Sequence, residues 1–215
     1  MSPLYLIFIG VAVVLFIAHS ITHRLLRRRS SPTPCPWFLI FLLENPLMNF
    51  LAGASVLIKR IKLAPGMNVI DVGCGPGRLT IPLAKYIGPT GHIFALDIQE
   101  KMLQMLGKRI MKNRLENVEV VLGGAGGGVL HHENAFDRAV LVTVLGEIPD
   151  KRKALEEIFK ALKPGGILSV TEVLLDPDYQ KAKNVCRLAS DVGFEFDAKY
   201  SNVIAFTMNF RKPGV

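Results

Sequence analysis

The stretch "MNVIDVGCGPGRLTIPLA", residues 67–84, joins a short apolar run to three glycines at alternate positions. Its first six residues are typical of a buried strand, and "GRLTIPLAKYIG", residues 77–88, is typical of a helix closed by Gly88. Gly73, Gly75 and Gly77 fall between them, where missing side chains let a ligand approach the backbone. Because the helix that follows directs its amide groups at the same place, we expect a ligand in this loop.

Two common glycine motifs do not fit this loop. A phosphate-binding P-loop ends in Gly-Lys-Ser/Thr, whereas Arg78, Leu79 and Thr80 follow here. A dinucleotide fingerprint needs a third glycine for close packing of the helix on the strand, and Arg78 occupies that position. The loop is therefore expected to bind a ligand of another class.

From residue 65 onward, strand and helix patterns alternate, which predicts an α/β fold with a mostly parallel sheet covered by helices on both faces. Asp150 is expected to cap a helix that ends before the turn at residues 164–166. The expected helices are 77–88, 99–113, 151–163 and 179–192, and the expected strands are 67–72, 91–97, 117–123, 136–148 and 167–175, followed by a hairpin of 194–200 and 202–210.

Four segments together resemble one known family. They are "DVGCGPG" at residues 71–77, "IFALD" ending in Asp97, "ALKPGGILSV" at residues 161–170 and the final hairpin. This set is similar to the class I S-adenosylmethionine-dependent methyltransferases, especially the branch of ubiquinone/menaquinone-type C-methyltransferases and small phospholipid N-methyltransferases. The resemblance covers about residues 45–212. It implies a Rossmann-like sheet of seven strands, one of them antiparallel, and S-adenosylmethionine as the cofactor.

The resemblance also implies the residues that hold the cofactor. Asp97 would accept hydrogen bonds from both ribose hydroxyls. The family usually places an aspartate on the adenine amino group after the third strand, but Gly124 stands there. Adenine would then be held by backbone groups and apolar contact, or the glycine run would order over the bound cofactor; a weak binder or an inactive relative also stays open. The expected cofactor residues are Asp71, Gly73, Cys74, Gly75, Gly77, Asp97, Ile98, Gly124 and Ala125.

Methyl transfer mainly requires alignment of the acceptor with an already activated methyl group, and a base only if the acceptor must lose a proton. Glu147 and Glu172 follow the fourth and fifth strands, close to the expected methyl position, and His132 lies in a loop beside His131. We therefore take Glu147, Glu172 and His132 as candidate catalytic residues. Glu147 could instead be a carboxylate at the start of a helix, and the paired histidines could simply be exposed to solvent. We expect no metal site, because neighbouring side chains in one loop rarely converge on an ion.

The N-terminal region has a different character. Residues 4–21 are uncharged and apolar, long enough at about 1.5 Å per residue to cross most of a bilayer core of about 30 Å. Arg24 and the arginines at 27–29 follow, so the positive-inside rule predicts a single-pass anchor with the N-terminus outside and the catalytic domain in the cytoplasm. We expect an anchor over 1–22, a basic, proline-rich interfacial segment over 23–44 and the methyltransferase domain over 45–215.

Composition supports a membrane rather than a nucleic-acid partner. The 215 residues carry a net charge of +8 and a mean hydropathy of +0.33, and the densest basic cluster adjoins the apolar segment. Nucleic-acid binders carry such charge as a patch on the folded domain. The scattered Cys35, Cys74 and Cys186 form no CxxC pair, which argues against disulfides and structural zinc.

The sequence thus predicts a membrane-anchored methyltransferase that acts on a lipophilic acceptor, either a phospholipid amine or a quinone-like ring. A second hypothesis treats the helix as a tether for an enzyme that acts on a soluble metabolite, metal(loid) or protein. A third is a non-catalytic cofactor-binding scaffold. Sequence leaves the oligomeric state open.

Overall fold

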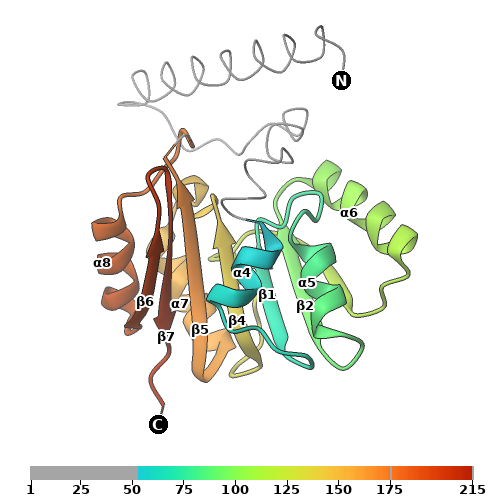
Figure 1. The fold of residues 1–215 in the computed structure, drawn as a ribbon, viewed down its shortest axis with the longest axis horizontal. Helices are drawn as coiled ribbons and strands as arrows, with labels where there is room; N and C mark the ends of the chain where they lie inside the picture. Colours follow the sequence, from blue (N-terminus) through green and yellow to red (C-terminus); the bar gives the residue numbers. More distant parts are fainter. Residues whose placement is uncertain (1–52, 175, 215) are drawn as a thin grey trace, which may run out of the picture.

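The computed structural model describes residues 53–174 and 176–214, which form a three-layer α/β sandwich around one sheet (Figure 1). The sheet has seven strands in the order β3-β2-β1-β4-β5-β7-β6. Its strands are β1 (Asn68–Val72), β2 (His92–Asp97), β3 (Val118–Leu122), β4 (Phe136–Val142), β5 (Leu162–Val173), β6 (Glu195–Ser201) and β7 (Ala205–Arg211). The first five are parallel, and β7 runs antiparallel to β5 and β6. The predicted sheet, with its antiparallel hairpin, is confirmed.

Helices cover both faces of the sheet because successive strand residues point to opposite sides. Val69, Ile93 and Val140 belong to one buried cluster, packed under α4 (Ala54–Arg60), α5 (Thr80–Ile87) and α6 (Glu100–Asn113). Ile70 and Phe94, their neighbours in sequence, pack with α7 (Lys151–Ala161) and α8 (Ala182–Val192) on the other face. A short 3-10 helix, η3 (Leu145–Glu147), follows β4. The core is therefore two apolar layers separated by the sheet.

The start of α7 is as expected, whereas its end and the start of α8 shift. Helix α7 ends at Ala161, and β5 begins at Leu162 instead of residue 167. Strand β4 ends at Val142, so the last residues of the expected strand 136–148 form η3 instead. Asp150 caps α7 by accepting a hydrogen bond from the Lys153 amide at 3.0 Å, as predicted. The helix expected from residue 179 begins only at Ala182. The amide of Gln180 instead donates to the Glu172 carboxylate at 3.1 Å, which holds residues 176–180 as a turn against the end of β5.

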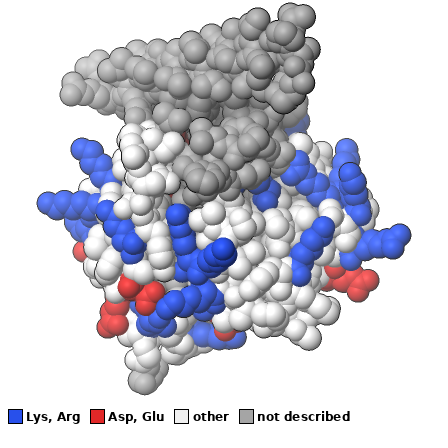
Figure 2. Space-filling model, in the orientation of Figure 1, with Lys and Arg blue, Asp and Glu red and all other residues white. Residues whose placement is uncertain are grey.

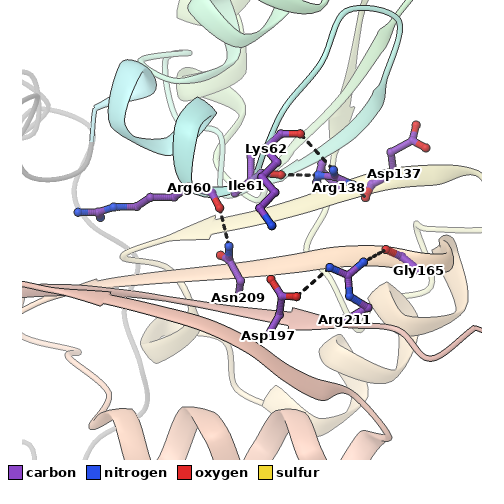
Figure 3. A network of polar contacts seen from close by, with 9 residues as sticks. All are labelled: Arg60, Ile61, Lys62, Asp137, Arg138, Gly165, Asp197, Asn209 and Arg211. Atoms are coloured by element: carbon purple, nitrogen blue, oxygen red, sulfur yellow. Dashed lines mark hydrogen bonds and ion pairs between the residues drawn. The ribbon is translucent and has the colours of Figure 1, made fainter.

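Side chains of the sheet donate hydrogen bonds to the backbone carbonyl groups at the C-terminal end of helix α4 (Figure 3). Arg138 on β4 donates from Nε to the Ile61 carbonyl at 2.6 Å and from Nη2 to the Lys62 carbonyl at 3.2 Å. Asn209 on β7 donates to the Arg60 carbonyl at 2.7 Å. These bonds satisfy carbonyls that the end of a helix leaves without partners, so two distant strands fix where α4 lies.

The predicted anchor (1–22) and most of the interfacial segment (23–44) concern residues outside the described part of the chain. Within residues 53–174 and 176–214, no helix combines the length and apolar character needed to cross a bilayer.

Candidate cofactor and acceptor site

The three glycines of the loop after β1 serve different purposes. All three have positive φ angles, of 66° at Gly73, 54° at Gly75 and 90° at Gly77, a region that glycine adopts without steric cost. A Cβ at Gly73 would lie 2.5 Å from a methyl group of Val144, and one at Gly77 would lie 2.5 Å from a methyl group of Leu106. A Cβ at Gly75 would meet nothing within 4 Å. Only Gly75 therefore leaves open space for a ligand, whereas the other two admit neighbouring side chains.

Asp97, the last residue of β2, holds this loop in place. Its Oδ2 accepts a hydrogen bond from the Gly75 amide at 2.9 Å, and its Oδ1 accepts one from the Gln99 amide at 2.8 Å. Burial raises the pKa of this carboxyl group, while the backbone hydrogen bonds oppose the rise. A third backbone hydrogen bond comes from Ile98. Since a carboxylate has about four acceptor positions, acceptor capacity remains for a ribose hydroxyl.

Asp71 and Cys74, which the sequence placed among the cofactor residues, are buried beneath the loop. Asp71 accepts a hydrogen bond from the Thr80 hydroxyl at 2.7 Å, and burial raises its pKa to about 6. The Cys74 thiol faces the Gly75 carbonyl at 3.7 Å, and burial raises its pKa as well. In this arrangement both residues support the loop from its protein side.

The glycine run after β3 lies beside the end of β2. The Gly123 amide donates to the Asp97 carbonyl at 3.0 Å, and a Cβ at Gly124 would lie 3.0 Å from the Ile98 side chain. Ile98 is 57% exposed, so it offers an apolar surface next to the Asp97 carboxylate, the predicted ribose contact, and Ala125 is buried. The predicted adenine residues therefore lie together at one side of the glycine loop.

Sequence reasoning missed the residue that organises this run. Glu157 on α7 accepts hydrogen bonds from the amides of Gly126, Gly128 (3.3 Å) and Leu130 (2.6 Å). A Cβ at Gly126 would lie 3.0 Å from the backbone nitrogen of Ala154, so the loop is pressed onto α7. The glycine run is thus a loop ordered around one carboxylate. The sequence offered only a weak signal for this contact, namely a run of glycines followed by a predicted helix with two adjacent glutamates.

The ends of β4 and β5 form the other side of the site. Thr143 has a φ of 57°, a strained conformation for a β-branched residue, and its amide donates to the Thr171 carbonyl at 2.8 Å. Val144 follows and packs on Gly73. A Cβ at Gly146 would lie 1.9 Å from the Asp178 carbonyl oxygen, so the turn after β5 lies directly on η3. A continuous wall therefore runs from the glycine loop to the end of β5.

Glu172 is the most unusual group in that wall. It is 1% exposed, and while its Oε2 accepts from the Gln180 amide, its buried Oε1 has no hydrogen-bond partner among the described residues. Burial raises the pKa of Glu172 to about 8, with smaller contributions from the charges of Asp176 and Glu147. Glu147 is half-buried in η3, so the structure brings these two predicted catalytic residues to the same edge of the sheet.

His132, the third predicted catalytic residue, is not brought to that edge. Its ring packs edge-on against Phe94 and Phe136, with centroids 5.3 Å away in both cases. Phe136 begins β4, whereas Glu147 follows the end of that strand. His132 therefore lies toward the amino-terminal edge of the sheet. The described residues contain no cluster of side chains suited to a metal ion.

Comparison with known proteins identifies the domain. A family model described as a methyltransferase domain matches residues 63–201. The chain belongs to this methyltransferase family. Demethylmenaquinone methyltransferase of Listeria welshimeri is 36% identical over 112 residues, which is 52% of this chain and 47% of that protein. The enzyme of the same name from Lactobacillus johnsonii is 33% identical over 114 residues, 53% of this chain and 47% of that protein. The matched part thus spans about half the length of these curated relatives.

The fold comparison agrees with the family. The crystal structure of an S-adenosylmethionine-dependent methyltransferase from Aquifex aeolicus superposes with a TM-score of 0.76 at 24% identity, covering 83% of this chain and 99% of that one. Family and fold imply S-adenosylmethionine as the cofactor. The site fits it, because the open space at Gly75 lies beside a carboxylate with remaining acceptor capacity and an exposed apolar residue, Ile98.

Proposed function

We propose that this chain transfers a methyl group from S-adenosylmethionine to a lipophilic acceptor with a quinone-type ring, at the cytoplasmic face of a membrane to which residues 1–22 anchor it. The cofactor supplies an electrophilic methyl group. The observation that carries the proposal is Glu172, a buried carboxyl group with one oxygen free among the described residues at the edge where Gly73, Val144 and η3 meet.

A ring carbon becomes nucleophilic when a neighbouring hydroxyl group loses its proton. Glu172 Oε1 would accept that proton, and the ring carbon would take the methyl group as the methyl–sulfur bond breaks and leaves a neutral thioether. The proton of that carbon would then leave to solvent as the ring regains aromaticity, and Glu172 would return its proton to the ring oxygen. A carboxyl group with a pKa of about 8 is a stronger base than an ordinary one, which suits it to accept a proton from a phenolic hydroxyl. The demethylmenaquinone methyltransferases among the relatives favour such a ring over a phospholipid amine.

The membrane part of the proposal is supported by the sequence. The apolar residues 4–21 and the arginines after them would confine the active site to the plane in which a long-chain quinone dissolves. Proximity of that kind raises the effective concentration of an acceptor that is nearly insoluble in water.

The acceptor can be identified with the full chain in non-ionic detergent and methyl-labelled cofactor. Reduced demethylmenaquinone, phosphatidylethanolamine and an aqueous metabolite extract would be offered separately. We expect label in the quinone fraction alone. Label only in phosphatidylethanolamine would show that the acceptor is a phospholipid amine and not a quinone ring. Label in the aqueous extract would favour a membrane-tethered enzyme that acts on a soluble acceptor. No transfer to any of the three would favour a non-catalytic scaffold.

The role of Glu172 is tested by the pH dependence of the rate. Because only the ionised form of Glu172 can accept a proton, kcat/KM should rise with pH and level off above about pH 8. Glu172→Gln should lower kcat by about 10²- to 10⁴-fold and remove that rise, while cofactor affinity measured by calorimetry stays unchanged. Asp176→Asn is the matched control, since it removes a neighbouring charge and leaves the base. An unchanged pH profile in Glu172→Gln would rule out this role.

A further inference from the structure

A second group of polar side chains lies on the face of the sheet that carries α4. Arg60, the last residue of α4, donates from Nη1 to the Thr207 hydroxyl at 2.7 Å, and that hydroxyl shares a 2.8 Å hydrogen bond with Thr171. The guanidinium carbon of Arg60 also lies 5.6 Å from the centre of the Tyr200 ring. A buried hydroxyl pair and an aromatic ring therefore hold this guanidinium in one position. Its other nitrogen donors have no acceptor among the described residues.

The fixed guanidinium lines a groove between α4 and β6 with a volume of about 340 Å³. Lys59 and Ser55 form an exposed rim, and Val56 provides an apolar wall. The groove lining consists of Ser55, Val56, Lys59, Arg60 and Tyr200. Two cations, a hydroxyl group and a short apolar surface thus face one space.

No described acidic residue neutralises the positive charge of this groove. Within residues 53–174 and 176–214, neither Lys59 nor Arg60 forms an ion pair with a carboxylate. The nearest acid along β6, Asp197, is engaged by Arg211 at 2.8 Å. Burial lowers the pKa of Arg60, but a guanidinium stays charged in proteins. Figure 2 shows lysine and arginine side chains spread over this face, with the acidic ones gathered near its lower corners.

We propose that this groove binds the phosphate group of a glycerophospholipid. The free nitrogens of Arg60 match the geometry of phosphate oxygens, Lys59 adds a second charge, and the Ser55 hydroxyl can donate to the same group. Val56 would contact the glycerol carbons. The apolar residues 37–43 lie a short way before α4 in the sequence, which favours a phosphate that belongs to a lipid surface. The site is separate from the glycine loop and does not depend on methyl transfer.

The test measures lipid binding by thermal unfolding of the full chain in non-ionic detergent micelles. Phosphatidylglycerol, diacylglycerol and inorganic phosphate would be titrated separately at constant ionic strength. We expect phosphatidylglycerol alone to raise the unfolding midpoint. Lys59→Gln should weaken its apparent affinity at least fivefold. The matched control is Lys85→Gln, which removes the same charge from an exposed lysine of α5 and should change the affinity less than twofold.

Arg60→Lys provides a second variant that keeps the charge and loses the planar donor set, and it should weaken binding as Lys59→Gln does. Wild-type affinity in both groove variants would overturn the proposal, as would an equal loss in Lys85→Gln, which would indicate general charge attraction. Equal stabilisation by inorganic phosphate would assign the groove to a soluble phosphate compound instead of a lipid. Stabilisation by diacylglycerol would show that the acyl chains, and not the phosphate, are bound.

Discussion

Gly73 and Gly75 both have positive φ angles but face different neighbours, and this difference can be measured. Alanine at either position meets the strain of a left-handed conformation, about 1–2 kcal/mol. At Gly73 it would also collide with Val144, whereas at Gly75 it would project into open space.

We therefore expect Gly75→Ala to weaken S-adenosylmethionine binding at least tenfold, with only the strain cost in stability. Gly73→Ala should lower the free energy of unfolding further than Gly75→Ala does. Calorimetry of cofactor binding and urea unfolding separate the two effects. If Gly75→Ala bound the cofactor as well as the wild type, the ligand could not lie against that residue.

Glu172 also makes the stability of the protein depend on pH. Its pKa is raised from 4.5 to about 8 by burial, so the folded protein holds a proton that the unfolded chain releases between these values. The free energy of unfolding should therefore fall as pH rises from about 4.5 to 8. Glu172→Gln, which is neutral throughout, should flatten this part of the profile. Urea unfolding at pH 5 and pH 8 for both proteins tests the slope, and identical slopes would contradict the assigned pKa.

At the scale of an element, the loop of residues 123–130 depends on one carboxylate of α7. Three amides converge on Glu157, and hydrogen bonds to a charged group are worth about 1.5–3 kcal/mol each. Gly124, which lies beside the Ile98 side chain at the expected adenine position, is at the start of this loop.

Glu157→Gln should therefore release the loop and weaken cofactor binding about tenfold. Hydrogen exchange of the Gly126, Gly128 and Leu130 amides should become faster, while exchange within β1 and β4 stays slow. Glu156→Gln is the control, since Glu156 lies one residue earlier on the same helix and, among the described residues, is bonded to Arg152 alone. Unchanged exchange at those three amides would show that the loop holds itself without Glu157.

For the whole molecule, the attachment of α4 links the first described helix to the middle of the sheet. Arg138 is half-buried. Among the described residues it supplies two of the three side-chain hydrogen bonds to the carbonyls at the end of α4, and Asn209 supplies the third (Figure 3). Burial lowers the pKa of Arg138 without removing its charge, and Asp137 counteracts the effect.

Arg138→Met should keep most of the packing and lose both hydrogen bonds, lowering the free energy of unfolding by about 2–4 kcal/mol. Limited proteolysis should then cut near residues 61–63 before it cuts elsewhere in the domain. Arg187→Met, at an exposed position of α8, is the control. Equal stability in Arg138→Met would mean that apolar packing of Leu57 and Ile61 is enough to hold the helix.

The sequence predicted the architecture well because its strands and helices have clear periodicity and clear boundaries. Asp150 was identified as a cap from its place before an amphipathic run, and the hairpin from two alternating segments. The start of α8 was missed because Gln180 is held by Glu172, a contact across eight residues that no local pattern encodes. His132 was grouped with the two glutamates because sequence does not tell which edge of the sheet a loop joins.

By itself, the sequence determined the succession of strands and helices along the chain and the glycine loop after β1, since these follow from local periodicity and glycine spacing. Asp97 was predicted as a ribose contact only through the resemblance to a known family. The tertiary structure decided which glycine borders open space, because Val144 and Leu106 come from distant segments to fill the space at Gly73 and Gly77. It also decided the proton affinity of Glu172 and the charge of the groove at Arg60. Both depend on burial and on neighbours that only folding brings together.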